Sequence, residues 1–186
     1  MKLGRRKPLR LQGHDYSSEG AYFVTVCTHD REYLFGEIEG GQMGLNEFWK
    51  IVQTIWDKLV ERFVNITTDQ FVIMPNHVHG IIMVNPSNVG AIHELPLPSG
   101  KKQRRRMLLP EIIGYFKMNT AKRINLLRNT PGIPVWQRNY YERVIRSESE
   151  LFEIRRYVQE NHLKWDLDPE NSHAHPERST LSAVRS

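Results

Sequence analysis

The sequence predicts a single α+β domain, a sandwich with helices on one face of an antiparallel sheet. Short strand-like runs alternate along the chain with longer segments of helical periodicity. A length of 186 residues allows one domain with a sizeable core. The content of 39% hydrophobic and 25% charged residues is typical of a globular protein. We expect the folded unit at residues 20–168, between a basic arm at 1–19 and a polar, disordered tail at 169–186.

Strands are expected where β-branched and aromatic residues cluster. The run from Ile66 to Val84 predicts either one long bent strand or two strands that meet at Pro75, because proline is disfavoured inside a central strand. The other expected strands are 21–29, 34–38 and 140–145, with a glycine-rich turn at 40–44.

Three helices follow from periodicity and capping signals. Asn46 is the expected N-cap of a helix whose apolar residues recur at spacings of three and four over 48–63. Pro110 is expected to open the second helix, since its fixed φ suits the first helical position. Ser147 and Glu150 form a capping box for the third helix.

The composition excludes several classes of protein. No run approaches the roughly 18 apolar residues that span a bilayer, so no membrane association is expected. The basic first residues lack the apolar segment of a secretory signal. Cys27 is the single cysteine, which rules out an intramolecular disulfide and fits the cytoplasm; its apolar neighbours favour a buried small hydrophobe.

Basic residues are unevenly distributed along the chain. Lys and Arg number 26 against 21 Asp and Glu, a net charge of +5. Clustered cations attract a polyanion and make its binding salt-dependent, although either cluster alone also fits a solvated loop. Two clusters in one chain favour a nucleic-acid partner. The clustered cations are Arg5, Arg6, Lys7, Arg10, Lys101, Lys102, Arg104, Arg105 and Arg106.

A pair of histidines interrupts the apolar run FVIMPNHVHGIIMV. His77 and His79 share a face if this run is a strand, because residues i and i+2 point the same way. Neutral imidazole is the commonest metal ligand in proteins. The pair is therefore either part of a metal site that takes a further ligand from elsewhere, or two polar residues packed on a sheet.

Tyr157 and Asn161 lie four residues apart on the third expected helix and so occupy one face of it. They are either a core tyrosine beside a surface amide, or a nucleophile beside a metal ligand. Tyrosine forms a covalent phosphotyrosine when a divalent cation polarises the phosphodiester. Mg²⁺ or Mn²⁺ suits such mixed oxygen and nitrogen coordination.

Four blocks of the sequence, MPNHVHGII, EIIGYFKMNTAKRIN, VWQRNYYERVIR and RRYVQENHLKW, resemble those of the single-tyrosine HUH transposases in the same order. The resemblance is closest to the REP-associated tyrosine transposases and covers about residues 22–168. It implies a ferredoxin-like fold and a metal-dependent endonuclease and strand transferase that acts on single-stranded or hairpin DNA through a 5′-phosphotyrosine. Relatives include monomers and homodimers.

The resemblance also implies roles for individual residues. His77, His79 and Asn161 correspond to the metal ligands for Mg²⁺ or Mn²⁺, and Tyr157 to the catalytic nucleophile. Relatives often carry proline directly after the asparagine, where this chain has His162. Further DNA-binding residues are expected in the second and third blocks, where the aromatic residues serve either base stacking or core packing. These residues are Lys117, Lys122, Arg123, Trp136, Arg138, Tyr140 and Tyr141.

Other functions fit the sequence less well. A catalytically silent DNA-binding protein of the same fold has no physical need for the two histidines, the tyrosine and the asparagine together. A replication initiator or relaxase usually carries extra domains, for which 186 residues leave little room. A simple metal hydrolase is disfavoured because the sequence shows no carboxylate-rich site.

Overall fold

The computed structural model of the chain describes residues 15, 18–40, 42–86, 107–168 and 170–171. The basic cluster at 101–106, most of the basic arm and most of the predicted tail lie outside the described residues. Among the helices in these ranges, none is long and apolar enough to cross a membrane.

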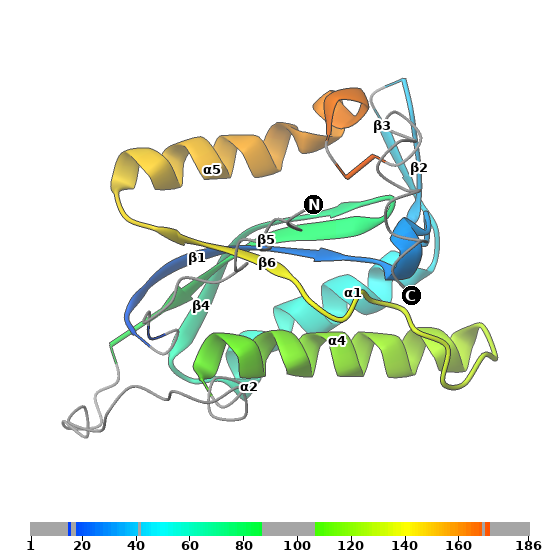
Figure 1. Ribbon diagram of the computed structural model, residues 1–186, viewed down its shortest axis with the longest axis horizontal. Helices are drawn as coiled ribbons and strands as arrows, with labels where there is room; N and C mark the ends of the chain where they lie inside the picture. Colours follow the sequence, from blue (N-terminus) through cyan, green and yellow to red (C-terminus); the bar gives the residue numbers. More distant parts are fainter. Residues whose placement is uncertain (1–14, 16–17, 41, 87–106, 169, 172–186) are drawn as a thin grey trace, which may run out of the picture.

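A four-stranded sheet forms the centre of the molecule (Figure 1). Its strand order is β4-β5-β1-β6, and every neighbouring pair is antiparallel. The strands are β1 (Gly20–Cys27), β4 (Ile66–Met74), β5 (His77–Val84) and β6 (Tyr141–Ile145). A separate two-stranded sheet pairs β2 (Gly36–Glu39) with β3 (Gln42–Leu45), so most of the predicted turn at 40–44 is a strand.

Helices cover both faces of the main sheet (Figure 1). On one face lie α1 (Phe48–Asp57), α2 (Leu59–Arg62) and α4 (Leu108–Leu127), and on the other lies α5 (Glu148–Glu160). Two short 3₁₀ helices, η1 (His29–Arg31) and η2 (Asn161–Leu167), follow β1 and α5. Helices α1 and α4 connect β1 to β4 and β5 to β6, which with the strand order makes a ferredoxin-like arrangement.

The predicted α+β class is therefore confirmed, but the expectation of helices on one face is wrong. The central strands β1 and β5 are apolar on both sides, so both sides need a cover. Val24 and Val78 point toward α1 and α4, whereas Phe23 and Ile81 point toward α5. Alternation along each strand produces the two faces.

The two faces differ in the size of their apolar core. The α1 and α4 face contains large buried side chains such as Phe35, Trp56 and Phe116. The α5 face has a smaller cluster of buried residues: Ala21, Phe23, Ile81, Ile145, Leu151, Ile154 and Val158. Its α5 members run from Leu151 to Val158, and the polar side chains of His77 and His79 lie on the same face of the sheet.

Local signals place the elements near the predicted positions, with two differences. The N-cap of α1 is Glu47, not the expected Asn46, and α4 begins at Leu108, so Pro110 is its third residue and does not open it. Strands β4 and β5 form a hairpin in which Met74 pairs with His77, so the second of the two alternatives at Pro75 is confirmed. The backbone N–H of Phe48 donates to Asn46 Oδ1 at 2.9 Å at the start of α1. At α5 the expected cap forms, since the Glu150 N–H donates to the side chain of the preceding Ser147 at 3.2 Å.

Gly80 is required by the packing of one aromatic ring. The ring of Trp56, stacked on Phe71 with centroids 4.2 Å apart, lies against the Gly80 backbone. A Cβ at this position would be 2.3 Å from Trp56 Cη2, a distance that no real contact allows. We expect Gly80→Ala to lower the free energy of unfolding by about 1–3 kcal/mol, measured by urea denaturation.

Gly114 provides the matched control, because a Cβ there would meet nothing within 4 Å in α4. Gly114→Ala should raise the free energy of unfolding by about 0.5–1 kcal/mol. Equal effects of the two substitutions would contradict the packing described for Trp56.

Candidate metal and tyrosine site

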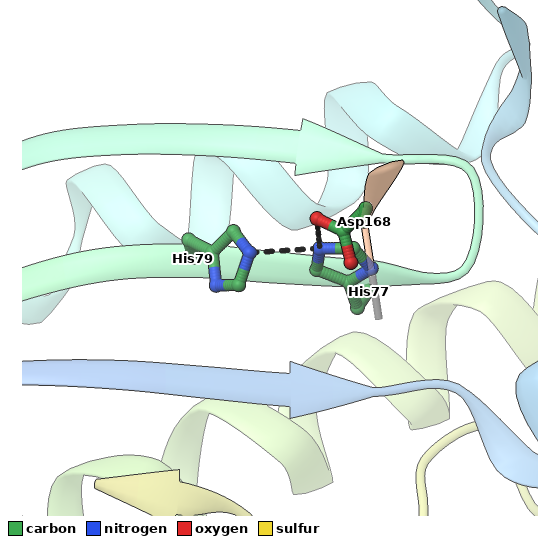
Figure 2. Close-up of side chains that lie close together, drawn as sticks. All are labelled: His77, His79 and Asp168. Carbon is green, nitrogen blue, oxygen red and sulfur yellow. Dashed lines mark hydrogen bonds and ion pairs between the residues drawn. The ribbon is translucent and has the colours of Figure 1, made fainter. Parts of the chain in front are cut away.

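His77 and His79 lie side by side on the α5 face of β5, as their spacing predicts. They are 0% and 3% exposed, and their Nε2 atoms are 2.9 Å apart (Figure 2). The expected common face of a strand-borne i, i+2 pair is thus confirmed. The Nε2 atoms of the two rings therefore face the same point.

The hydrogen-bond network defines how His77 is protonated. The side-chain nitrogen of Asn76 donates to the Glu170 carbonyl at 2.7 Å, which leaves Asn76 Oδ1 facing His77 Nδ1 at 2.8 Å. An amide oxygen only accepts, so His77 carries its proton on Nδ1 and presents a lone pair at Nε2. Thr25 Oγ1 pairs with His79 Nδ1 at 2.8 Å, and a hydroxyl can be either donor or acceptor in this contact. Such outer partners orient imidazole ligands toward a metal.

Asp168 completes a buried cluster with the histidines (Figure 2). Its Oδ2 lies 3.9 Å from His77 Nε2, and the possible ligand atoms of the three residues lie within 4.8 Å of one another. Asn161 is 1% exposed and donates from Nδ2 to Asp168 Oδ2 at 3.2 Å. Among the described residues, Asn161 Oδ1 has no hydrogen-bond partner despite its burial.

The donor set suits a divalent cation. Burial, with the charge of Arg31 as a second cause, lowers the pKa of His77 to about 3 from the ordinary value of 6.5. Burial and the neighbouring His77 also lower the pKa of His79, against an opposing effect of Asp168. Both imidazoles are therefore neutral at pH 7, the form that binds metal. Two imidazoles, a carboxylate and an unsatisfied amide oxygen can bind a divalent cation.

Asp168 was not identified from the sequence. It lies seven residues after Asn161, directly after η2, and no spacing rule connects it with the histidines. From the sequence, residue 168 was predicted only to be the end of the folded domain. The chain continues in contact with the site, because the Glu170 N–H donates to Asp168 Oδ1 at 2.7 Å.

Tyr157 lies at the edge of this cluster. Its hydroxyl is 3.3 Å from His79 Nε2, and its ring packs edge-on against Phe23 with centroids 6.0 Å apart. Burial, followed by the negative charge of Asp168, raises the pKa of Tyr157 to about 12, while a hydrogen bond with Asn161 opposes the rise. The phenol is thus protonated at neutral pH, and added positive charge at the cluster would lower its pKa.

A cavity of about 600 Å³ opens beside Tyr157 and His79. Tyr140 and Tyr141, two of the predicted stacking residues, also line it. The charged side chains among its described lining residues are Arg31, Arg143, Glu153, Asp168 and Glu170. Because carboxylates outnumber guanidinium groups here, an anionic ligand requires additional positive charge in the cavity.

An ion pair holds α5 against the sheet near Tyr157. Arg155 donates from Nε and Nη2 to Asp69 Oδ2 at 2.8 and 2.5 Å. Asp69 lies where the β4–β5 pairing shifts register between Thr68 and Phe71. A bulge of this kind re-aims a side chain out of the ladder. Arg155 lies two residues before Tyr157. Its ion pair with Asp69 therefore adds to the small apolar cluster in holding α5 on the sheet.

The remaining predicted DNA-binding residues are dispersed. Lys122 and Arg123 are exposed on α4, across the sheet from the histidines. The Lys117 ammonium donates to backbone carbonyls of residues 137–139, next to the cavity. Arg138 is exposed in that same segment. The predicted residues Arg5, Arg6, Lys7, Lys101, Lys102, Arg104, Arg105 and Arg106 lie outside the described residues.

Trp136 has a structural position rather than a DNA-facing one. Its side chain is 7% exposed and packs between Phe35 and Phe116, and its indole N–H donates to Thr120 Oγ1 at 2.8 Å. Of the two uses considered for this ring, the structure indicates core packing. Its backbone forms an isolated antiparallel bridge with Thr28, which brings the 137–141 segment to the end of β1.

Comparison with known proteins finds a curated relative and nine chains of solved structures, two of which are described below. An uncharacterized protein of Haemophilus influenzae is 37% identical over 175 residues, covering 89% of this chain and 93% of that protein. A REP-associated tyrosine transposase bound to a REP hairpin aligns with a TM-score of 0.46 and 18% identity, over 88% of this chain and 74% of the other. A candidate transposase from Deinococcus radiodurans aligns with a TM-score of 0.46 and 15% identity, over 87% and 98%. No family model matches the chain.

The buried histidines predict acid sensitivity of the metal-free protein. The unfolded chain protonates these histidines near pH 6.5, whereas the folded protein protonates His77 only near pH 3. Their contribution to stability is therefore complete above about pH 6.5 and is lost as the pH falls toward 3. Thermal melting in EDTA should show the melting temperature falling over this range. His77→Gln should have a shallower pH dependence, and an unchanged dependence would contradict the burial of a neutral imidazole.

The Asp69–Arg155 ion pair predicts the local stability of α5. Asp69→Ala should speed amide hydrogen exchange in α5 relative to α4, because the small apolar cluster alone would then hold the helix. Arg156→Ala is the matched control on the same helix, since its ion pair with Glu153 is exposed and spans only three residues. Equal exchange in both variants would show that Asp69 does not hold α5.

Proposed function

This chain belongs to the same family as the 37% identical Haemophilus influenzae protein, and we propose that it is a metal-dependent single-stranded DNA endonuclease and strand transferase of the transposase type. The main support is the position of the Tyr157 hydroxyl, 3.3 Å from His79 Nε2, at a buried His–His–Asp cluster. A nucleophile beside a cation site is what covalent phosphoryl transfer requires. The four sequence blocks that resemble REP-associated tyrosine transposases contain Tyr157 and both histidines, whereas Asp168 lies beyond the last block.

The ligand set follows from the geometry of the cluster. His77, His79 and Asp168, with Asn161 Oδ1 beside them, would hold a divalent cation, Mg²⁺ or Mn²⁺, which would supply positive charge to polarise a phosphate oxygen. Asn76 and Thr25 keep the two imidazoles oriented for that task. This set adds Asp168 to the three ligands expected from the sequence.

Tyr157 performs the chemical step. Its oxygen attacks the phosphorus, an O–P bond forms, and the bond from phosphorus to the 3′ oxygen of the preceding nucleotide breaks. The phenol loses one proton and the departing 3′ oxygen gains one, so the step is balanced. The product is a 5′-phosphotyrosine and a free 3′-hydroxyl. Attack by a second 3′-hydroxyl reverses the step and joins two strands without a nucleotide cofactor.

The cavity beside Tyr157 suits an unpaired nucleotide. Its volume of about 600 Å³ is in the range of small-molecule sites. Tyr140 and Tyr141 are placed to stack on a base, an interaction that single-stranded DNA makes readily. The basic arm and the cluster at 101–106 would contact the backbone of an adjacent hairpin. A cytoplasmic monomer or homodimer is the form we propose for this activity.

A catalytically silent DNA-binding protein accounts less well for the site. Burying two imidazoles, a carboxylate and an unsatisfied amide oxygen in one place is unfavourable without a bound ligand. The cavity also has more carboxylates than guanidinium groups among its described lining residues, which opposes DNA binding there unless a cation is present. Both features favour the metal-dependent enzyme.

Cleavage of labelled single-stranded hairpin DNA with Mg²⁺ or Mn²⁺ tests the proposal. The wild type should yield a cut strand and a protein-linked fragment on a denaturing gel, and Tyr157→Phe should yield neither while still binding DNA. Tyr115→Phe is the matched control, because this tyrosine lies on α4, on the other face of the sheet, where its ring packs edge-on against Phe63. Cleavage by Tyr157→Phe would identify another nucleophile. Binding without cleavage by the wild type, over a broad pool of hairpins, would favour the silent protein.

A further inference from the structure

Two consecutive residues after β1 hold an unfavourable backbone conformation. Asp30 and Arg31 have φ values of 49° and 57°, in the left-handed region that residues with side chains rarely adopt. Such strain persists only where surrounding contacts impose it, and it concentrates at functional sites. Here Thr28 supplies the contacts, since Oγ1 lies 2.8 Å from the Glu32 carbonyl oxygen and 2.9 Å from the Asn76 carbonyl oxygen, which share its one proton. The strained turn directs the Arg31 side chain into the cavity beside Tyr157.

Arg31 is the guanidinium close to the metal cluster. Its backbone carbonyl accepts from Nδ2 of Asn76, the residue before His77, and its side chain lines the same cavity as His79 and Asp168. Arg143, the other arginine among the described lining residues, is paired with Glu150 at 2.6 Å near the start of α5. That end of the helix lies about two turns from Tyr157. Arg31 is therefore the cation positioned to act where Tyr157 would react.

The partner of Arg31 is a carboxylate from the end of the described chain. Glu170 forms an ion pair with Arg31 and accepts a hydrogen bond from Cys27 Sγ at 3.2 Å. Partial burial raises the pKa of the Cys27 thiol, so this group stays protonated and donates. The sequence favoured a buried small hydrophobe here, whereas Cys27 is half-buried and hydrogen-bonded. The side chains of Arg31 and Glu170 are 24% and 26% exposed, so an incoming anion has access to the pair.

We propose that Arg31 binds the phosphate that Tyr157 attacks, and that the Glu170 carboxylate occupies the place of this phosphate until DNA enters. This inference rests on the proposed function. A guanidinium presents paired N–H donors that match the two non-bridging oxygens of a phosphodiester, as they match a carboxylate. Charge on these oxygens builds as the O–P bond to Tyr157 forms, so the contact stabilises the transition state more than the bound substrate. Glu170 withdraws into solvent when the phosphate replaces it.

Two variants of the full chain separate this role from a structural one. Arg31→Gln should slow single-turnover formation of the protein–DNA adduct by about 10²–10³-fold, the usual effect of removing one donor to a developing negative charge. Glu170→Gln removes the same ion pair but keeps the guanidinium, so it should retain cleavage and bind DNA more tightly. Arg31→Lys should keep the DNA affinity but recover only part of the rate, because an ammonium lacks the fork of donors.

Binding measured with metal but without cleavage provides a second readout. For a single-stranded oligonucleotide with Mg²⁺, in a Tyr157→Phe background, the logarithm of the binding constant falls linearly with the logarithm of the salt concentration. Arg31→Gln should make this slope shallower by about 0.7, the contribution of one phosphate contact on a single strand. Thermal melting of each variant verifies that the fold is retained.

The outcomes distinguish failure of the inference from failure of the proposed function. Equal loss of cleavage in Arg31→Gln and Glu170→Gln would show that the ion pair only holds the chain in place, which overturns the inference and leaves the proposed function intact. No cleavage by the wild type on any hairpin would overturn the proposed function. The salt dependence of DNA binding would then test whether Arg31 contacts a phosphate. A slope unchanged in Arg31→Gln would overturn the inference.

Discussion

The buried side chain of Asn76 joins the parts of the candidate site. Its oxygen faces His77 Nδ1, and its nitrogen donates to the carbonyls of Glu170 and Arg31. Its own backbone carbonyl accepts from the N–H and the hydroxyl of Thr28. One fully buried amide thus connects the β4–β5 turn, the first histidine, the strained turn after β1 and the end of the described chain. Because an amide has distinct donor and acceptor ends, these partners also determine which nitrogen of His77 carries the proton.

The charges and pKa values of its buried groups determine what the candidate site can bind. Two buried neutral imidazoles, a buried carboxylate and a tyrosine of raised pKa form an arrangement that added positive charge would stabilise. The same charge would make the phenol more acidic and offset the carboxylates around the cavity. In the function that we propose, metal binding, activation of Tyr157 and DNA entry would therefore be coupled through one local charge balance. Glu170 takes part in it, since its carboxylate neutralises Arg31 in the free protein.

The asymmetry of the fold leaves room for this polar site. Large aromatic side chains fill the α1 and α4 face of the sheet, so the stability of the domain depends mainly on that side. The α5 face has only a small apolar cluster beside its polar groups. The Asp69–Arg155 ion pair also connects α5 to the sheet, so the position of Tyr157 on this helix depends on a contact with the edge strand β4.

Interactions within single helices and strands were sufficient to predict much of the secondary structure from the sequence. Periodicity and caps indicated the helices, and strand alternation placed His77 and His79 on one face. The i, i+4 spacing placed Tyr157 beside Asn161, because these relations depend only on the geometry of a single element. The β2–β3 hairpin was only partly predicted, since a glycine-rich segment carries little strand signal.

Only the tertiary structure determined which distant groups meet. Asp168 reaches the histidines, and Glu170 reaches Arg31 and Asn76, through the path of η2 and the residues after it. The cover on the second face of the sheet likewise required α5 to cross β1 and β5, which no local pattern shows. The sequence by itself therefore determined the elements and the residues within them that share a face. The ligand set, the cavity and its charge depended on contacts between residues far apart in the chain, whose geometry exists only once the chain has folded.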